Sequence, residues 1–184
     1  YLIPANAHAA VVLEQLANLP AAVGVPAELS NQSRELASLI RGGISSHGII
    51  EVAGQRTYAY EVDGRGNALF MDDANTPSLL SLPFLGWCAT DDPLYLATRD
   101  RILSPDNPWF FSGIRGAGLG SPHTPVGHIW PIAIAMAGLT AATAHEMAAA
   151  LELLEATDAG SGQMHESFHC DDPEQFTSPW FSWA

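Results

Sequence analysis

The residues best suited to chemistry lie near the end of the chain, in the run His165-Glu166-Ser167-Phe168-His169. This run fits the H-E-x-x-H pattern, in which two histidines one helical turn apart bind zinc and the glutamate acts as a general base. Glu166 is therefore the leading candidate for a catalytic carboxylate. A zinc metallopeptidase that uses His165 and His169 is one hypothesis for the function.

The residues around this run argue against a zinc-binding helix. Gly160 and Gly162 precede it, and each glycine weakens a helix by about 1 kcal/mol relative to alanine. The turn Asp171-Asp172-Pro173 follows, and a residue before proline is biased away from helical geometry. The longer zinc pattern needs a third ligand, but Asp172 and Gln175 stand where it requires Gly and His. We therefore expect a polar loop with no metal ligands and no cofactor.

Three polar loops carry side chains that suit a sugar-binding site. They are Met71-Asp72-Asp73-Ala74-Asn75, Ser121-Pro122-His123-Thr124-Pro125 and Met164-His165-Glu166-Ser167. Tryptophans follow two of them, Trp130 after the second and Trp180 with Trp183 after the third. Polar side chains hydrogen-bond to hydroxyl groups, and flat aromatic rings pack against the C–H faces of a sugar. The predicted substrate-binding residues are Asp72, Asp73, Asn75, His123, Thr124, Trp130, His165 and Trp180.

The composition restricts the kinds of partner that the chain can bind. Its 184 residues fit one domain of ordinary size or a piece of a larger one, and 47% hydrophobic residues allow a substantial core. The net charge of −13, with seven Arg and no Lys, argues against nucleic acid, because phosphate binding needs clustered cations. No apolar run is long enough to span a bilayer, so we expect no membrane contact.

Short helices joined by turns and long polar loops are expected, which indicates an all-α fold with small β-hairpins. The helices are predicted at 4–19, 26–40, 77–87, 93–103, 129–139, 143–155 and from 178 to 184. Alternation between residues 48 and 71 predicts one or two hairpins, and 109–120 is expected to be extended. Gly42-Gly43 is expected to end the second helix, and Thr143 with Glu146 to form a capping box. Helical hairpins around an axis would gather the long loops at one rim.

Six longer segments carry a resemblance that spans the chain in order. They are Tyr1-Leu-Ile-Pro-Ala-Asn6, Leu69-Phe-Met-Asp-Asp-Ala-Asn-Thr-Pro-Ser-Leu-Leu80, Gly118-Leu-Gly-Ser-Pro-His-Thr-Pro125, Ile129-Trp-Pro131, Gly162-Gln-Met-His-Glu-Ser-Phe168 and Phe176-Thr-Ser-Pro-Trp-Phe-Ser-Trp-Ala184. Together they are similar to glycoside hydrolase family 125. The resemblance implies an exo-acting α-1,6-mannosidase on an (α/α)6 barrel, which works with inversion and without metal. It also implies an N-glycan-derived, mannose-containing oligosaccharide as the substrate.

The resemblance implies catalytic roles as well. The Glu of Met-His-Glu-Ser is the general base of the family, which maps onto Glu166. The general acid is an Asp shortly before the Tyr-Leu-Ile-Pro segment, and this chain starts at Tyr1. Apolar residues at both ends of the chain also indicate that it is a fragment of a longer protein. We assign no cellular compartment to that protein. The expectation is one domain, residues 1–184, which is the C-terminal portion of a larger (α/α)6 catalytic domain truncated at both ends and lacks the general acid.

Structural roles stay open for several of these residues. Asp72 and Asp73 are expected to divide between sugar contact and anchoring of the chain, in either order. His123 either contacts a sugar or stabilises its loop, and Trp130 and Trp180 either stack on a sugar or belong to the core. A non-catalytic carbohydrate-binding module that uses the tryptophan-rich loops is a third hypothesis, beside the hydrolase and the peptidase.

Overall fold

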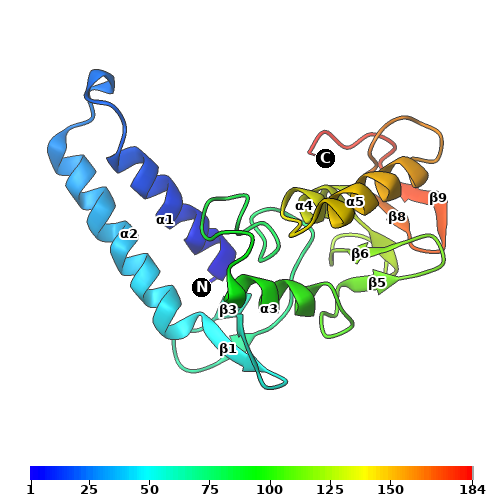
Figure 1. Ribbon diagram of the computed structural model, residues 1–184, viewed down its shortest axis with the longest axis horizontal. Helices are drawn as coiled ribbons and strands as arrows, with labels where there is room; N and C mark the ends of the chain where they lie inside the picture. The colour runs from blue at the N-terminus through cyan, green and yellow to red at the C-terminus, as the bar shows by residue number, and fades with distance from the viewer. Residues whose placement is uncertain (184) are drawn as a thin grey trace.

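The computed structural model describes residues 1–183 as short helices linked by short strands and turns (Figure 1). The helices are α1 (Ile3–Ala17), α2 (Ala27–His47), α3 (Pro93–Ile102), α4 (Pro131–Leu139) and α5 (Ala144–Ala156), with a 3-10 turn at Ala21–Val23. The strands are β1 (Ile49–Val52), β2 (Gln55–Tyr58), β3 (Glu61–Val62), β4 (Ala68–Leu69), β5 (Phe110–Ser112), β6 (Ala117–Leu119), β7 (His128–Ile129), β8 (Ser167–His169) and β9 (Asp172–Thr177). They form four small sheets, β1-β2, β3-β4, β5-β6 and β7-β8-β9. The all-α prediction is therefore too narrow, because the loops between helices pair as strands.

α1 and α2 form a helical hairpin that projects from the rest of the molecule as an arm (Figure 1). Small side chains allow the two helices to pack closely, since Ala7 and Ala10 of α1 and Ala37 of α2 are buried. Arg41 of α2 donates two hydrogen bonds to the carboxylate of Glu14 in α1, at 2.5 and 2.8 Å. The two helices predicted at 4–19 and 26–40 are thus confirmed as a packed pair.

α2 runs further than the sequence predicts. The helix passes through Gly42-Gly43 and continues to His47. A glycine inside a helix costs only about 1 kcal/mol, and a Cβ at either position would meet no atom within 4 Å. The helix ends instead at Gly48, where a Cβ would lie 2.9 Å from the carbonyl oxygen of Ile44. The stop at Gly42-Gly43 was therefore the wrong prediction, and Gly48 is the glycine that the fold requires.

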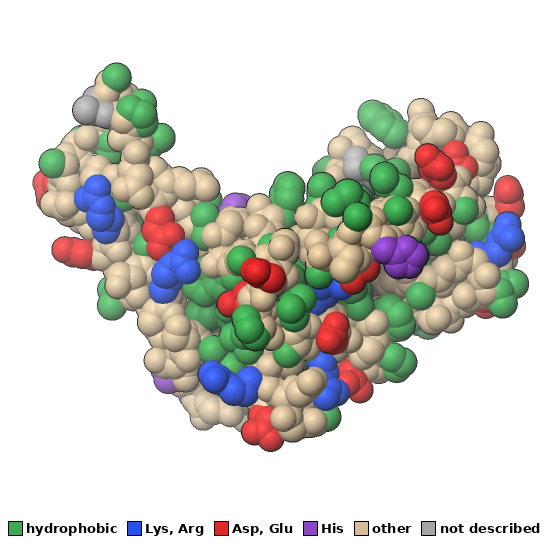
Figure 2. Space-filling model, viewed as in Figure 1, with side chains coloured by type: hydrophobic (Ala, Val, Ile, Leu, Met, Phe, Trp, Pro, Cys, Tyr) green, Lys and Arg blue, Asp and Glu red, His purple; other side chains and the backbone are tan. Residues whose placement is uncertain are grey.

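Apolar side chains remain on the outer surface of two helices. Leu29, Leu36 and Leu39 of α2 are exposed, and so are Met147 and Leu151 of α5. Figure 2 shows hydrophobic side chains at the surface of the arm and of the opposite end, with the outline of the molecule hollowed between them. The leucines of α2 thus face solvent, while its small residue Ala37 packs against α1.

The chain between α2 and α3 contains the two predicted hairpins. β1 pairs with β2, and the turn between them places Ala53 and Gly54 at φ angles of 47° and 81°. β3 pairs with β4 in a shorter hairpin. The backbone N–H of Tyr58 in β2 donates to Oγ1 of Thr98 in α3 at 2.9 Å. This bond holds the first hairpin against the helix that follows.

Residues 77–87 form a series of turns rather than the predicted helix. Pro77 and Pro83 have no N–H to donate, and only isolated helical bonds form, such as Leu85 N–H to the carbonyl oxygen of Ser81 at 2.9 Å. The segment is nevertheless part of the main hydrophobic core, whose fully buried members include Leu79, Leu80, Leu82, Tyr95, Ile102 and Leu119. Burial of these leucines fixes the loop that carries Asp72 and Asp73.

The C-terminal part contains α4, α5 and the β7-β8-β9 sheet, at the end of the molecule away from the arm (Figure 1). Thr143 caps α5 as predicted, since its Oγ1 accepts the N–H of Glu146 at 3.2 Å. The carboxylate of Glu146 accepts the N–H of Ala142 rather than that of Thr143, so the capping box is only half formed. Ile129, Ile134, Phe168 and Cys170 form a second, smaller core beneath the sheet.

The end of the chain is not the helix predicted from residue 178. Residues 178–183 form turns, and Ala184 lies outside the described residues. The N–H of Phe181 donates to the carbonyl oxygen of Met164 at 3.1 Å, which draws this segment back towards the loop before β8. No helix within residues 1–183 is both long and apolar enough to cross a bilayer.

Candidate active site

A cavity of about 750 Å³ brings together residues from distant parts of the chain. Its lining consists of Leu2, Tyr60, Asp73, Asn75, Thr76, Pro77, His123, Trp130, Ile132, Glu166, Phe181 and Trp183. Five of the nine residues predicted for the site are among them: Asp73, Asn75, His123, Trp130 and Glu166. All three polar loops singled out in the sequence therefore reach the same cavity.

Glu166 lies immediately before β8 and is half-buried. Its backbone N–H donates to the carbonyl oxygens of Thr177 (3.1 Å) and Ser178 (3.2 Å), which continues the pairing of β8 with β9 by one residue. Its Oε2 atom accepts a hydrogen bond from Oγ of Ser178 at 3.2 Å. The backbone is thus fixed by a sheet, while the carboxylate reaches the cavity.

Trp130 directly follows β7 and lines the same cavity as Glu166. Ile129 of β7 lies opposite Phe168 of β8, and both side chains are completely buried. Because the strands are antiparallel, Trp130 follows Ile129 towards the residues that precede β8. Nε1 of Trp130 donates to Oγ1 of Thr124 at 2.8 Å. The predicted residue Thr124 therefore does not line the cavity itself but orients the ring that does.

Asp73 and Asn75 form a turn at the cavity wall. Oδ1 of Asp73 accepts hydrogen bonds from the backbone N–H of Asn75 (3.0 Å) and from its side-chain amide (2.9 Å). Oδ2 of Asp73 accepts a longer bond from Oγ of Ser121 at 3.4 Å. Ser121 also accepts the N–H of His123 at 3.3 Å, so this serine links two of the polar loops.

Asp72 anchors the chain and does not reach the cavity. It is completely buried, and its two oxygens accept the N–H groups of Leu79 (2.8 Å) and Leu80 (2.9 Å). Burial raises the pKa of Asp72 to about 7, against the opposing effect of these hydrogen bonds. The side chain of Asn107, also buried, exchanges hydrogen bonds of 3.2 Å with the backbone of Asp72. Of the two roles left open for Asp72 and Asp73, Asp72 therefore has the anchoring one.

His165 is also a structural residue in this arrangement, not a cavity residue. Its ring is completely buried and stacks on Phe176, with centroids 3.9 Å apart and planes inclined by 4°. Nδ1 lies 2.8 Å from the carbonyl oxygen of Pro179, and Nε2 lies 3.1 Å from that of Asp158. Trp180 is 66% exposed and does not line the cavity. Neither residue lines this cavity, and the substrate contacts predicted for them stay predictions.

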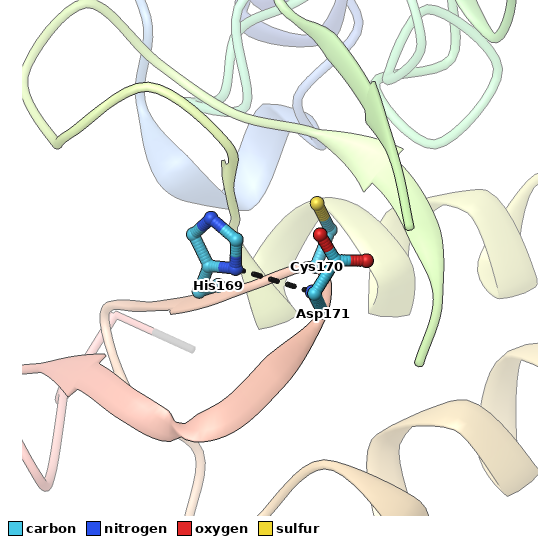
Figure 3. A group of neighbouring side chains, drawn as sticks. All are labelled: His169, Cys170 and Asp171. Carbon is cyan, nitrogen blue, oxygen red and sulfur yellow. Dashed lines mark hydrogen bonds between the residues drawn. The ribbon is translucent and has the colours of Figure 1, made fainter. Parts of the chain in front are cut away.

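The zinc-binding geometry of H-E-x-x-H is not formed. Residues 167–169 are the strand β8, so His165 and His169 are not one helical turn apart, and both ring nitrogens of His165 already face carbonyl oxygens. Figure 3 shows His169 beside Cys170 and Asp171, whose possible ligand atoms lie within 4.8 Å of one another. These groups serve the turn between β8 and β9. Nδ1 of His169 accepts the N–H of Asp171 (3.2 Å), and Asp171 accepts the N–H of Ile114 (2.8 Å).

Seven residues of the lining were not predicted as site residues, and three of them are aromatic: Tyr60, Phe181 and Trp183. Burial, together with the negative charges of Asp73 and Asp72, raises the pKa of Tyr60 to about 12, so its hydroxyl remains a hydrogen-bond donor. Phe181 meets Trp130 edge to face at 5.6 Å, and Trp183 lies 5.3 Å from Phe181. The cluster of aromatic residues from 180 to 183 was the available signal. That cluster did not indicate which of its aromatic rings would face the cavity.

The charge of the cavity favours a neutral ligand. Its described lining includes two carboxylates, Asp73 and Glu166, and no Arg or Lys. An anionic substrate would be repelled there, whereas a sugar offers hydroxyl donors to the carboxylates and C–H faces to the aromatic rings. The arrangement suits a polyhydroxylated ligand held against one carboxylate that is free to act as a base.

Comparison with known proteins agrees with this geometry. The chain is 44% identical over 186 residues to the "Meiotically up-regulated gene 157 protein" of Schizosaccharomyces pombe; the match covers all of this chain and 36% of the relative. It is 45% identical, with a TM-score of 0.96, to a metal-independent alpha mannosidase of Streptococcus pneumoniae solved in a non-productive complex with alpha-1,6-mannobiose. That match covers all of this chain and 44% of the solved one. The chain thus spans less than half the length of either relative.

A more distant structural match concerns the fold alone. A bacterial glucoamylase in complex with acarbose matches 94% of the chain, and 30% of the enzyme, at 18% identity and a TM-score of 0.68. Both solved structures have the (α/α)6-barrel fold. The family model for metal-independent alpha-mannosidases (GH125) matches residues 1–184. The chain therefore belongs to the GH125 family of metal-independent alpha-mannosidases.

Proposed function

We propose that the protein containing this chain is an inverting exo-α-1,6-mannosidase and that Glu166 is its general base. One observation carries the proposal: Glu166 lines the same cavity as Asp73, Asn75 and His123, in a chain of the GH125 family. The bound disaccharide of the Streptococcus pneumoniae relative, alpha-1,6-mannobiose, supports the substrate class. That relative's study concerns the processing of N-linked glycans, which supports an N-glycan-derived oligosaccharide as the natural substrate.

In this mechanism, the Glu166 carboxylate accepts a proton from a water molecule. The water attacks the anomeric carbon of the terminal mannose from the face opposite the leaving oxygen, so the configuration inverts. Asp73 and Asn75 accept hydrogen bonds from sugar hydroxyls, and Tyr60 donates one. Trp130 and the neighbouring aromatic residues form the apolar wall of the site. No step requires a metal ion or an organic cofactor.

The leaving oxygen needs a proton from a second carboxyl group. An inverting enzyme places this general acid about 6.5–9.5 Å from the base, which leaves room for the water. Asp73 accepts three hydrogen bonds, and this holds it as an acceptor rather than as a proton donor. We propose that the acid comes from residues upstream of Tyr1. Residues 1–184 are then the C-terminal portion of a larger (α/α)6 catalytic domain.

The test of the base is Glu166→Gln in the protein as its gene encodes it, assayed on α-1,6-mannobiose. We expect kcat to fall at least about 100-fold, because glutamine cannot accept the proton. Glu174→Gln, which alters an exposed carboxylate of β9, is the matched control and retains turnover. Proton NMR of the first product distinguishes inversion, which gives β-mannose, from retention. Undiminished turnover in Glu166→Gln contradicts the assignment of the base.

A chelator separates the hydrolase from the zinc peptidase. Turnover of α-1,6-mannobiose is expected to be unchanged by EDTA, and its loss would contradict the proposed reaction. The carbohydrate-binding hypothesis predicts that the full protein binds mannobiose without any turnover. Calorimetry alongside the activity assay identifies that outcome.

A further inference from the structure

Ser178 meets the Glu166 carboxylate from a backbone conformation that serine seldom adopts. Its Oγ donates to Oε2 of Glu166 at 3.2 Å. Its φ angle is +45°, in the left-handed region that disfavours residues with a Cβ by roughly 1–2 kcal/mol. Pro179 follows, and a proline further restricts the residue before it. Strained conformations of this kind persist where the surrounding structure holds them, and they occur often at functional sites.

The surrounding structure does hold Ser178 firmly. On one side, the hydroxyls of Ser167 and Thr177 are hydrogen-bonded at 2.7 Å, at the last pair of the β8-β9 ladder. On the other side, the buried ring of His165 contacts the carbonyl oxygen of Pro179 at 2.8 Å. The N–H of Glu166 donates to the carbonyl oxygen of Ser178 itself at 3.2 Å. The chain on both sides of Ser178 is therefore tied to the chain on both sides of Glu166.

The backbone conformation at position 178 would favour glycine, so the side chain of Ser178 is the reason for a serine there. Glycine adopts a positive φ without strain, and eight glycines of this chain do so. A glycine at 178 would satisfy the turn but would leave Oε2 of Glu166 without its hydrogen bond. Oε1 accepts no hydrogen bond from residues 1–183. The single hydroxyl thus occupies one oxygen of the carboxylate and leaves the other for a ligand.

We propose that Ser178 is a positioning residue that fixes the rotation of the Glu166 carboxylate, so that Oε1 faces the attacking water. This proposal rests on the proposed function of Glu166 as the general base. Ser178 transfers no proton and contacts no sugar. Its hydroxyl selects one orientation of the carboxylate before the substrate binds, which lowers the entropy lost in reaching the reactive geometry.

Three substitutions at position 178 separate the hydrogen bond from the backbone. Ser178→Gly removes the donor and relieves the strain, and Ser178→Ala removes the donor and keeps the strain. Ser178→Asn supplies a new N–H donor from a residue that tolerates the left-handed region. Ser182→Gly, in the same turn but outside the cavity lining, is the matched control. Each variant is assayed on α-1,6-mannobiose in the protein as its gene encodes it, and its thermal midpoint is recorded.

We expect the substitutions that remove the donor to lower kcat and to leave KM nearly unchanged. We expect kcat to fall about tenfold in Ser178→Gly and Ser178→Ala, with KM within about twofold of the wild type. The thermal midpoint of Ser178→Gly stays equal to or above that of the wild type, so lost stability does not explain the lower rate. Ser178→Asn recovers part of kcat, and Ser182→Gly retains all of it.

Full kcat in Ser178→Gly overturns the proposal, since the backbone alone would then suffice. Equal defects in the glycine and asparagine variants overturn it as well, because the donor would make no difference. These outcomes are distinct from failure of the proposed function, which appears as undiminished turnover in Glu166→Gln. A full-length protein without any turnover removes both proposals together.

Discussion

Asp72 and Asp73 are adjacent in the chain and meet different surroundings. Asp72 is buried behind the cavity and accepts two backbone N–H groups, whereas Asp73 lines the cavity and accepts hydrogen bonds from Asn75. One aspartate therefore fixes the loop, and the other faces the cavity. The same substitution at the two positions is expected to have unlike effects.

Asp72 makes the stability of the chain depend on pH. Burial raises its pKa to about 7 in the folded chain, whereas an aspartate in an unfolded chain has a pKa of about 3.9. Between these values the folded state binds more protons than the unfolded state, so the free energy of unfolding decreases as pH rises. The slope approaches about 1.4 kcal/mol per pH unit.

We expect Asp72→Asn to lose this dependence, measured by thermal unfolding at about pH 5, 6 and 7. The amide does not titrate, and it also leaves one buried N–H of Leu79 or Leu80 without an acceptor. Asp73→Asn is the neighbouring control and keeps the slope of the wild type. An identical slope in Asp72→Asn and in the wild type contradicts the raised pKa.

Asp73→Asn is expected to weaken binding without weakening the fold. The retained oxygen still accepts both bonds from Asn75, and the new amide can donate to Ser121. One acceptor for a sugar hydroxyl is lost, so the affinity for α-1,6-mannobiose falls about tenfold in calorimetry. Asp91→Asn, at an exposed position outside the cavity lining, leaves the affinity unchanged. Equal affinity in the two variants would remove Asp73 from the site.

The sequence identified the loop of Asp72 and Asp73 but not their separate roles. Both aspartates lie among the same polar and turn residues, and local patterns do not distinguish a carboxylate that faces a cavity from one that faces its own backbone. The distinction depends on Leu79 and Leu80, which are drawn into the core, and on the buried amide of Asn107. Contacts between residues 35 positions apart have no signature in a single sequence.

At the scale of elements, His165 joins three segments of the C-terminal part. It bridges the loop at Asp158 and the turn at Pro179 through its two ring nitrogens, and it stacks on Phe176 of β9. His169, the other histidine of the H-E-x-x-H pattern, is only half-buried and accepts one hydrogen bond from Asp171. The two histidines therefore contribute unequally to the fold.

Alanine substitution at these two positions tests that inequality. We expect His165→Ala to lower the free energy of unfolding by about 2–4 kcal/mol, since it removes a buried ring and its polar contacts with the carbonyl oxygens of Asp158 and Pro179. His169→Ala is expected to cost less than about 1 kcal/mol. Denaturant unfolding measures both values. A shared zinc ion would make the two losses similar and would add a stabilisation that a chelator removes.

Helices were predicted most accurately where a local signal marks their ends. Asp92 caps α3 by accepting the N–H groups of Leu94 and Tyr95, and the prediction at 93–103 agrees with the observed helix. The predictions at 77–87 and from 178 failed, because prolines interrupt both segments and long-range bonds draw them elsewhere. The β7-β8-β9 sheet fixes Glu166. Its β7-β8 pairs join residues 39 and 41 positions apart, and strands this short show no alternation from which the pairing could be predicted.

At the scale of the whole molecule, exposed apolar faces agree with the proposal that residues 1–184 are one portion of a larger barrel. Leu36 and Leu39 of α2 are 48% and 73% exposed, and α5 has no fully buried residue. In the barrel of the Streptococcus pneumoniae relative, this chain corresponds to 44% of the length. We propose that the remaining helices of the barrel cover these two faces.

The 184-residue chain on its own is therefore expected to self-associate through α2. Burying two exposed leucines between copies releases hydration water from apolar surface, at about 25 cal/mol per Å² of area covered. The double substitution Leu36→Ser and Leu39→Ser removes most of that surface without touching the α1 contact, which uses Ala37. Sedimentation velocity over a range of concentrations is expected to show a lower weight-average mass for this variant. Leu69→Ser, at an exposed leucine of β4, is the matched control and leaves the association unchanged.

In a chain extended to the length of its relatives, the double substitution Leu36→Ser and Leu39→Ser is expected to lower the thermal midpoint, because the two leucines are then buried. Monomeric behaviour of the 184-residue chain at all concentrations, or an unaltered midpoint in the extended chain, contradicts a covered α2 face.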